Sequence, residues 1–336
     1  MMKQIIRNLF GGIFLLSMTS VYAAQITVSI PPLAGIVSPL LDDEDELHVL
    51  LKPGVSPHGF QLKPSHLLAL KKSDLAIAVG TPVDAWLDKA LTHYENTVIK
   101  LSELEGVKTL PARQGGLWEK SGHSHGDEQD VHAQHDEVDS HEKGHQDEHE
   151  DEHEQLRNDG HLWLSIDNVR LLISETSRQL QILKPNKAKQ IQQRAAAWLQ
   201  RLENVDGEIA AQLKPVKNQP FVVLHDAYQY FEKHYGLNGV GSIRLNPEIA
   251  PSLKRVQAVR ERIQQQGIRC VFKEPQFPAK RISAVVSGLD VKVGSLDPMG
   301  VYSADGTRIE SEYKTYDQLL TRLANAMSDC LAAAAE

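Results

Sequence analysis

The stretch "NKAKQIQQRAAAWLQRLENVDGEIAAQLK", residues 186–214, decides the fold because it predicts one long amphipathic helix. Its apolar side chains recur every three or four residues and form a single stripe. Asn186 is a suitable N-cap, and Pro215 ends the helix. At 1.5 Å per residue the helix is about 40 Å long, which exceeds the width of one small sheet, so we expect it to run between two lobes. The stripe consists of Ile191, Ala195, Trp198, Leu202, Val205, Ile209 and Leu213.

On both sides of this helix, short β-rich runs alternate with helical patterns. Strands separated by helices are typical of βαβ units, which form mainly parallel sheets. The predicted fold class is therefore α/β, with two lobes that each contain a mainly parallel sheet flanked by helices. The strand candidates before the long helix are 26–30, 46–51, 75–80 and 98–101, and those after it are 221–226, 239–244, 269–274 and 291–297.

The N-terminus, "MMKQIIRNLFGGIFLLSMTSVYAAQITV", has the pattern of a secretory signal peptide. Lys3 and Arg7 precede an apolar run at 9–18, and "VYA" at 21–23 fits a cleavage site. A membrane anchor is the alternative, but the run is short for a spanning helix and no charge cluster follows it. We predict a signal peptide over residues 1–24 and export to a bacterial periplasm.

Acidic charge is concentrated in one segment. Residues 121–154 contain thirteen Asp or Glu and one Lys, a balance of −12 in a chain of net charge −8, so the remainder carries +4. The segment has no apolar periodicity and cannot bury enough surface to offset the entropy of ordering, which predicts disorder. No basic stripe with interleaved aromatics occurs, which argues against a nucleic-acid partner. The segment holds eight histidines: His123, His125, His132, His135, His141, His145, His149 and His153.

The chain has two cysteines, Cys270 and Cys330. In an oxidising compartment an even pair usually forms a disulfide, and that is the prediction here. The alternative is a pair of thiolate metal ligands, but two widely spaced cysteines lack the CxxC spacing of such sites.

Four residues outside the acidic segment stand where a metal site is expected. His58 follows the strand candidate 46–51, while His225 and Asp297 end strand candidates and His161 lies where the chain re-enters the fold. Ligands of open α/β sheets bind at the carboxyl ends of strands, so these side chains could meet between the lobes. Three imidazoles and a carboxylate suit Zn²⁺. The alternative, for each histidine alone, is a hydrogen-bonded structural or surface residue.

Enzyme motifs are absent from the sequence. It contains no HExxH, no GxSxG and no GxxxxGK[ST]. A zinc hydrolase would also need a general base, for which Glu248 and Glu274 are candidates because both lie near predicted strand ends. The alternative is that these carboxylates anchor loops by accepting backbone hydrogen bonds.

Several longer sequence segments resemble one known protein family. In chain order they are "LKPGVSPHGFQLKPSHLLALKKSDLAIAVG", "HLWLS", "VLHDAYQYFEKHYGL", "NPEIAPS", "CVFKEPQF" and "GSLDPMG". With them, the whole mature chain resembles the periplasmic zinc-binding proteins of high-affinity zinc ABC importers, the ZnuA type, within the metal-binding cluster of bacterial solute-binding proteins. The resemblance implies two α/β lobes joined by one long rigid helix, with one metal in the cleft.

The resemblance also implies the metal ligands. They are His58 in "SPHGF", His161 in "HLWLS" and His225 in "HDAY". The manganese-binding branch usually has a glutamate where His225 stands, which argues for zinc. Some zinc members have a glutamate directly before the first histidine, where this chain has Pro57. The fourth ligand is then Asp297 or water, and Asp297 is the expectation.

By resemblance, the protein is expected to capture Zn²⁺ in the periplasm and deliver it to a membrane permease driven by a cytoplasmic ATPase. It makes and breaks no covalent bond, and we expect a monomer. The predicted domains are an N-terminal lobe at 25–185, a linking helix at 186–214 and a C-terminal lobe at 215–336. The histidines of the acidic segment are interpreted as a low-affinity zinc collector, with a solvated spacer as the alternative.

Overall fold

The computed structural model describes residues 23–80, 82–118, 158–244, 248–278, 280–301 and 315–332. Nearly all of the predicted signal peptide and all of the acidic segment lie outside these ranges. Within them, no helix combines the length and the apolar character that crossing a membrane requires.

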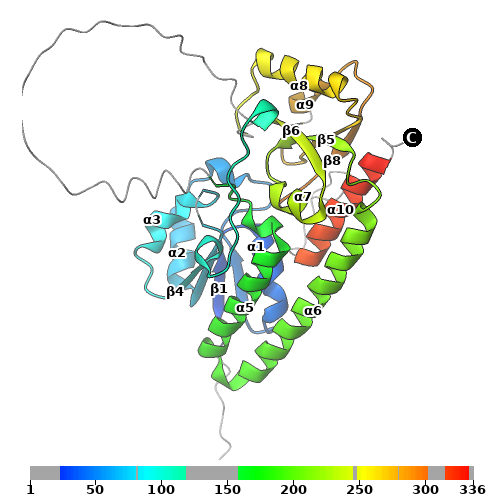
Figure 1. Ribbon diagram of the computed structural model, residues 1–336. Coiled ribbons are helices and arrows are strands. Elements are labelled where there is room, and N and C mark those ends of the chain that lie inside the picture. The colour runs from blue at the N-terminus through cyan, green and yellow to red at the C-terminus, as the bar shows by residue number, and fades with distance from the viewer. Residues whose placement is uncertain are drawn as a thin grey trace, which may run out of the picture.

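Each lobe contains one four-stranded parallel sheet (Figure 1). The strand order is β2-β1-β3-β4 in the N-terminal lobe and β6-β5-β7-β8 in the C-terminal lobe. All eight predicted strands and the predicted α/β fold class are thereby confirmed. The strands are β1 Gln25–Val28, β2 Glu46–Val49, β3 Leu75–Ala78, β4 Thr97–Lys100, β5 Pro220–His225, β6 Asn238–Arg244, β7 Cys270–Lys273 and β8 Lys292–Ser295.

Helices cover both faces of each sheet because alternate strand residues point to opposite sides. In β3, Leu75 and Ile77 belong to the cluster that contains α1 and α5, while Ala76 and Ala78 belong to the cluster that contains Leu70 of α2. The other sheet lies between α8 and α9 on one face and α10 on the other. The helices are α1 Pro31–Val37, α2 Pro64–Lys72, α3 Asp88–Leu91, α5 Ile166–Leu183, α7 Gln229–Tyr235, α8 Leu253–Gln265, α9 Lys280–Val286 and α10 Tyr316–Ala332.

The long helix is α6, Ala188–Leu213, with 26 residues. It lies within the predicted range and ends two residues before Pro215, as expected. Its start differs from the prediction, because Asn186 lies inside a short 3₁₀ turn, Pro185–Lys187, and caps nothing. The proline begins this turn, so the α-helix starts only after it. The domain boundaries proposed on each side of the helix stay predictions.

Helix α6 joins the two lobes through one continuous apolar core (Figure 1). Its stripe is buried in a cluster that also contains β1 of one lobe and Phe221 of the other. The Trp198 indole N–H donates to the Ile36 carbonyl at 3.0 Å, and Arg201 Nε donates to Asp317 of α10 at 2.6 Å. The lobes are therefore packed on a shared helix rather than linked by an exposed hinge.

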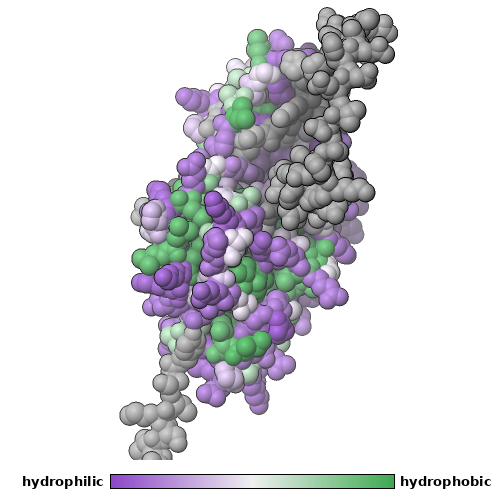
Figure 2. Space-filling model, turned by 90° about the vertical axis from the view of Figure 1, so that its left-hand side faces the viewer, coloured by the Kyte–Doolittle hydropathy of each residue, from purple (hydrophilic) through white to green (hydrophobic). Residues whose placement is uncertain are grey.

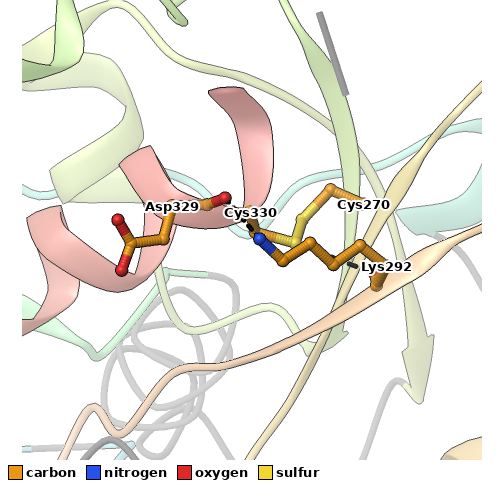
Figure 3. The surroundings of a disulfide bond; sticks show 4 residues. All are labelled: Cys270, Lys292, Asp329 and Cys330. Atoms are coloured by element: carbon orange, nitrogen blue, oxygen red, sulfur yellow. Dashed lines mark hydrogen bonds between the residues drawn. A yellow bond between two sulfur atoms is a disulfide. The ribbon is translucent and has the colours of Figure 1, made fainter. Parts of the chain in front are cut away.

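The predicted disulfide is confirmed: Cys270 at the start of β7 is bonded to Cys330 on α10 (Figure 3). It closes a sequence separation of 60 residues. Beside it, Lys292 Nζ donates to the Asp329 carbonyl at 2.7 Å (Figure 3). Both sulfurs are buried, so the bridge fixes the C-terminal helix onto the sheet from inside the core.

Replacing both cysteines by serine should lower the free energy of unfolding by about 3–4 kcal/mol, because the unfolded chain regains the entropy of an open loop. Urea denaturation of the double variant measures this loss. Reduced wild-type protein is the matched control and should lose a similar amount. An unchanged unfolding midpoint in both samples would contradict the assigned stabilising role.

Candidate metal centre

Three histidines that are far apart in the sequence meet at the junction of the lobes. One ring nitrogen from each of His58, His161 and His225 can be chosen so that all three lie within 4.8 Å of one another. Their ring centroids are 5.3 to 5.6 Å apart. The small pocket between them is also lined by Trp163 and Met299. This is a group of donors suited to a transition-metal cation.

His161 is held in place by a carboxylate two residues before it. Asp159 Oδ1 accepts from the His161 backbone N–H at 3.0 Å and lies 2.7 Å from the ring Nδ1. Gly160 packs so closely on Pro82 and Val83 that a Cβ there would lie 2.7 to 2.8 Å from their side chains. The Asp-Gly-His sequence therefore fixes the ring with Nδ1 engaged and leaves Nε2 for a metal.

His225 has a similar carboxylate partner from the adjacent strand. It ends β5, and Glu274 directly follows β7, which lies beside β5 in the sheet. Glu274 Oε1 is 2.5 Å from His225 Nδ1. Glu274 is buried, and the bond from this oxygen goes to a ring nitrogen rather than to a backbone amide of a loop. It orients His225 as Asp159 orients His161.

His58 is the exposed member of the group. It lies in a 3₁₀ turn, Pro57–Gly59, where its backbone N–H donates to Ser56 Oγ at 3.3 Å. Among the residues that the structure describes, its ring makes no hydrogen bond. The site thus has two histidines fixed by carboxylates and one that faces solvent.

The protonation of these histidines depends on their different neighbours. Desolvation, together with the nearby His225 and His161 rings, holds the pKa of His58 well below its usual value. Burial acts to lower the pKa of His225, but the charge and hydrogen bond of Glu274 outweigh it and raise that pKa. The His58 imidazole is therefore neutral near pH 7, whereas His225 retains a proton to a higher pH than an ordinary imidazole does.

Asp297 is not brought into the histidine group. Its Oδ1 accepts from the Met299 N–H at 2.9 Å, and its Oδ2 accepts from the Val301 N–H at 2.6 Å. Glu248, the other candidate base, lies near the mouth of the site, since its Cγ is 3.9 Å from the position a Cβ would take on Gly59. The eight histidines predicted for secondary metal capture lie outside the described residues.

The chain segments that flank the acidic insert are fixed close to the site. Asp159 N–H donates to the Leu110 carbonyl at 2.7 Å. Tyr230 of α7 ties both segments to the C-terminal lobe, because its hydroxyl accepts from the Leu110 N–H at 2.9 Å and donates to the Asp159 carbonyl at 2.8 Å. Arg113 pairs with Asp226, the residue after His225. The loop that carries His161 is therefore fastened to both lobes.

A larger hollow lies elsewhere on the N-terminal lobe. On the side that carries α2 and α3, Figure 2 shows hydrophobic groups at the surface among hydrophilic ones. Leu67 of α2 is 47% exposed there and lines a hollow together with Trp86 and Tyr94. The only histidine that lines this hollow is His93, so the chemistry of the chain places the candidate metal centre in the smaller pocket.

Sequence reasoning found the three histidines but missed Asp159 as the partner of His161 and misjudged Glu274. The Asp-Gly-His spacing is a local signal for Asp159, since an acidic side chain two residues before a ligand can reach its ring. The role of Glu274 could be found only after the neighbouring positions of β5 and β7 were known.

Comparison with known proteins gives consistent matches along the chain. The family model described as ZnuA, zinc-uptake complex component A, periplasmic, matches residues 26–330. A high-affinity zinc uptake system protein ZnuA from Brucella abortus is 36% identical over 312 residues, which are 91% of each chain. A crystal structure of ZnuA is similar with a TM-score of 0.69 at 22% identity, over 92% of this chain and 99% of the other. FpvC from Pseudomonas aeruginosa in complex with Mn²⁺ is similar with the same TM-score, at 17% identity, over 93% and 99%. The fold alone therefore does not select the metal.

Replacing Asp159 by alanine should weaken zinc binding by about ten- to a hundredfold, because His161 loses the partner that orients its ring. Asp159→Asn should lose less, since the amide oxygen still accepts from Nδ1–H. Competition with a chromophoric zinc chelator measures both affinities. The control is Asp167→Ala, which removes an exposed carboxylate paired with Arg170. Equal affinities for the Asp159 and Asp167 variants would contradict the positioning role.

Proposed function

The chain belongs to the ZnuA family of periplasmic zinc-uptake components, and from this membership we propose that it captures Zn²⁺ between His58, His161 and His225 and delivers it to a membrane importer. The observation that carries the proposal is the convergence of three imidazole nitrogens at the lobe junction. Imidazole is a preferred zinc ligand, and three histidines with one further position form a common zinc coordination set.

The geometry needs only a small contraction to hold zinc. With Zn–N bonds of about 2.0–2.1 Å and tetrahedral angles, the three nitrogens would be about 3.4 Å apart. In the structure they lie within 4.8 Å of one another. Asp159 and Glu274 add two buried carboxylates behind the ligands, which offset the charge of a divalent cation in a site of low polarity.

The proposed setting follows the family. The protein acts as a monomer in the periplasm, delivered there by the predicted signal peptide, and presents its cargo to a permease subunit with a cytoplasmic ATPase. The relatives' name, high-affinity zinc uptake system protein, supports zinc as the cargo. The His-rich segment at 121–154 is proposed to collect zinc ions at low affinity near the cleft.

A secreted zinc enzyme is the other function that three histidines with an open position could support. The family is one of transport proteins that bind solutes, not of enzymes. We therefore propose that the protein catalyses no reaction.

Zinc titration calorimetry tests the location of the tight site. The combined change of His58, His161 and His225 to alanine should abolish the tight one-to-one binding. Deletion of 121–154 should leave it intact and remove only weaker binding. Loss of tight binding in the deletion, with retention in the triple variant, would place the cargo site in the insert and overturn the proposal.

Zinc affinity should rise with pH and then level off. Glu274 raises the pKa of His225, so the metal must displace a proton from this ring at pH values below that pKa. Affinity should therefore fall about tenfold per pH unit on the acid side for each proton displaced. Glu274→Gln removes the charge that raises this pKa. The zinc affinity of this variant should therefore level off at a lower pH than that of the wild type. Chelator competition between pH 5 and 8.5 measures both curves, and coincident curves would contradict the assignment.

A further inference from the structure

The three histidines leave one position of a tetrahedral ion to be filled. The side chain expected there, Asp297, has both carboxylate oxygens on backbone amides of the turn that follows it. Drawing that carboxylate onto the metal would leave the Met299 and Val301 N–H groups without their acceptor, which is unfavourable for buried groups. The side chain of Pro57, next to His58, offers no donor atom.

Two other side-chain oxygens in the pocket wall accept no hydrogen bond from the described residues. Gln276 Oε1 and Glu274 Oε2 are both buried, and neither has a hydrogen-bond partner among the residues that the structure describes. Both residues follow β7, and both line the pocket with the three histidines. A buried acceptor without a donor lowers the stability of the fold, so a partner that arrives with the cargo would be favoured.

A metal-bound water is the donor that these acceptors lack. A cation polarises its water, which strengthens the hydrogen bonds that the water donates. Such a water can donate two hydrogen bonds, and the pocket wall contains two acceptors without a donor, Gln276 Oε1 and Glu274 Oε2. The space between the histidines is itself no larger than a small ion and one water require.

We infer that Gln276 is a positioning residue for the cargo: its side-chain carbonyl, with the free oxygen of Glu274, holds a water molecule in the fourth position of the bound zinc. This inference rests on the proposed function. It gives the cargo three protein ligands and one exchangeable ligand. An incoming donor group can replace that water without displacing any part of the chain, which suits a protein that must give up its metal.

Cobalt provides a spectroscopic test of the fourth position. Co²⁺ replaces Zn²⁺ in tetrahedral sites and absorbs visible light according to its ligands. If water is the fourth ligand, added azide should displace it and shift the visible spectrum of the wild-type Co²⁺ protein. If a carboxylate of the chain occupies the position, the spectrum should not respond to azide.

Variants of Gln276 test the positioning role itself. Gln276→Leu removes the acceptor and should weaken zinc binding about tenfold or more while changing the Co²⁺ spectrum. Gln276→Glu keeps an oxygen acceptor and should retain or increase the affinity. The matched control is Gln229→Leu, because Gln229 Oε1 is also buried without a partner but lies outside the pocket. Thermal unfolding of each variant checks that the fold is intact.

The outcomes distinguish a failure of the proposed function from a failure of the role assigned to Gln276. If the wild type binds no zinc at one-to-one stoichiometry, the proposed function fails. If the wild type binds zinc tightly, but azide leaves the Co²⁺ spectrum unchanged and Gln276→Leu matches Gln229→Leu in affinity and spectrum, the proposed function stands and the role of Gln276 is wrong.

Discussion

The packing of both lobes against one helix is the constraint on which the site depends. Six side chains of α6 are buried in a core that runs from β1 of one sheet to β5 of the other. His58, His161 and His225 are separated by 103 and 64 positions in the sequence. Their ring nitrogens can stay close enough to bind one ion only if the lobes keep their relative positions. The Trp163 indole N–H, which donates to the Pro298 carbonyl across the lobe junction at 2.9 Å, adds a direct tie beside the pocket.

Within that frame, hydrogen bonds decide which nitrogen of His161 and of His225 is left for the proposed metal. Asp159 and Glu274 each engage an Nδ1, so Nε2 is the free atom on His161 and His225. The same two carboxylates provide negative charge behind the candidate ligands, and they do so from buried positions where charge interactions are strong. Orientation and charge balance therefore come from the same pair of side chains.

Much of this arrangement could be predicted from the sequence, because it follows from local periodicity and strand ends. The eight strands, the long helix and the resemblance to the zinc-uptake family were predicted and are confirmed. The N-cap at Asn186 was wrong, since Pro185 begins a separate 3₁₀ turn. The pairing of Glu274 with His225 depends on β5 and β7 being neighbours in the sheet. The alternation of apolar and polar residues along one strand does not reveal which strands are neighbours. The environment of Asp297 depends on a turn whose amides compete for its oxygens.

The site is consequently asymmetric, and the asymmetry has a physical origin in the fold. His225 ends a central strand and His161 follows a loop fastened by Tyr230, so both rings are buried and hydrogen bonded. His58 stands on a single 3₁₀ turn and is the exposed residue of the three. For the proposed cargo, fixing His161 and His225 in advance lowers the entropy that binding would cost, while His58 remains accessible from outside. The proposed site therefore offers a preformed pair of donors, and its solvent side is the side of His58.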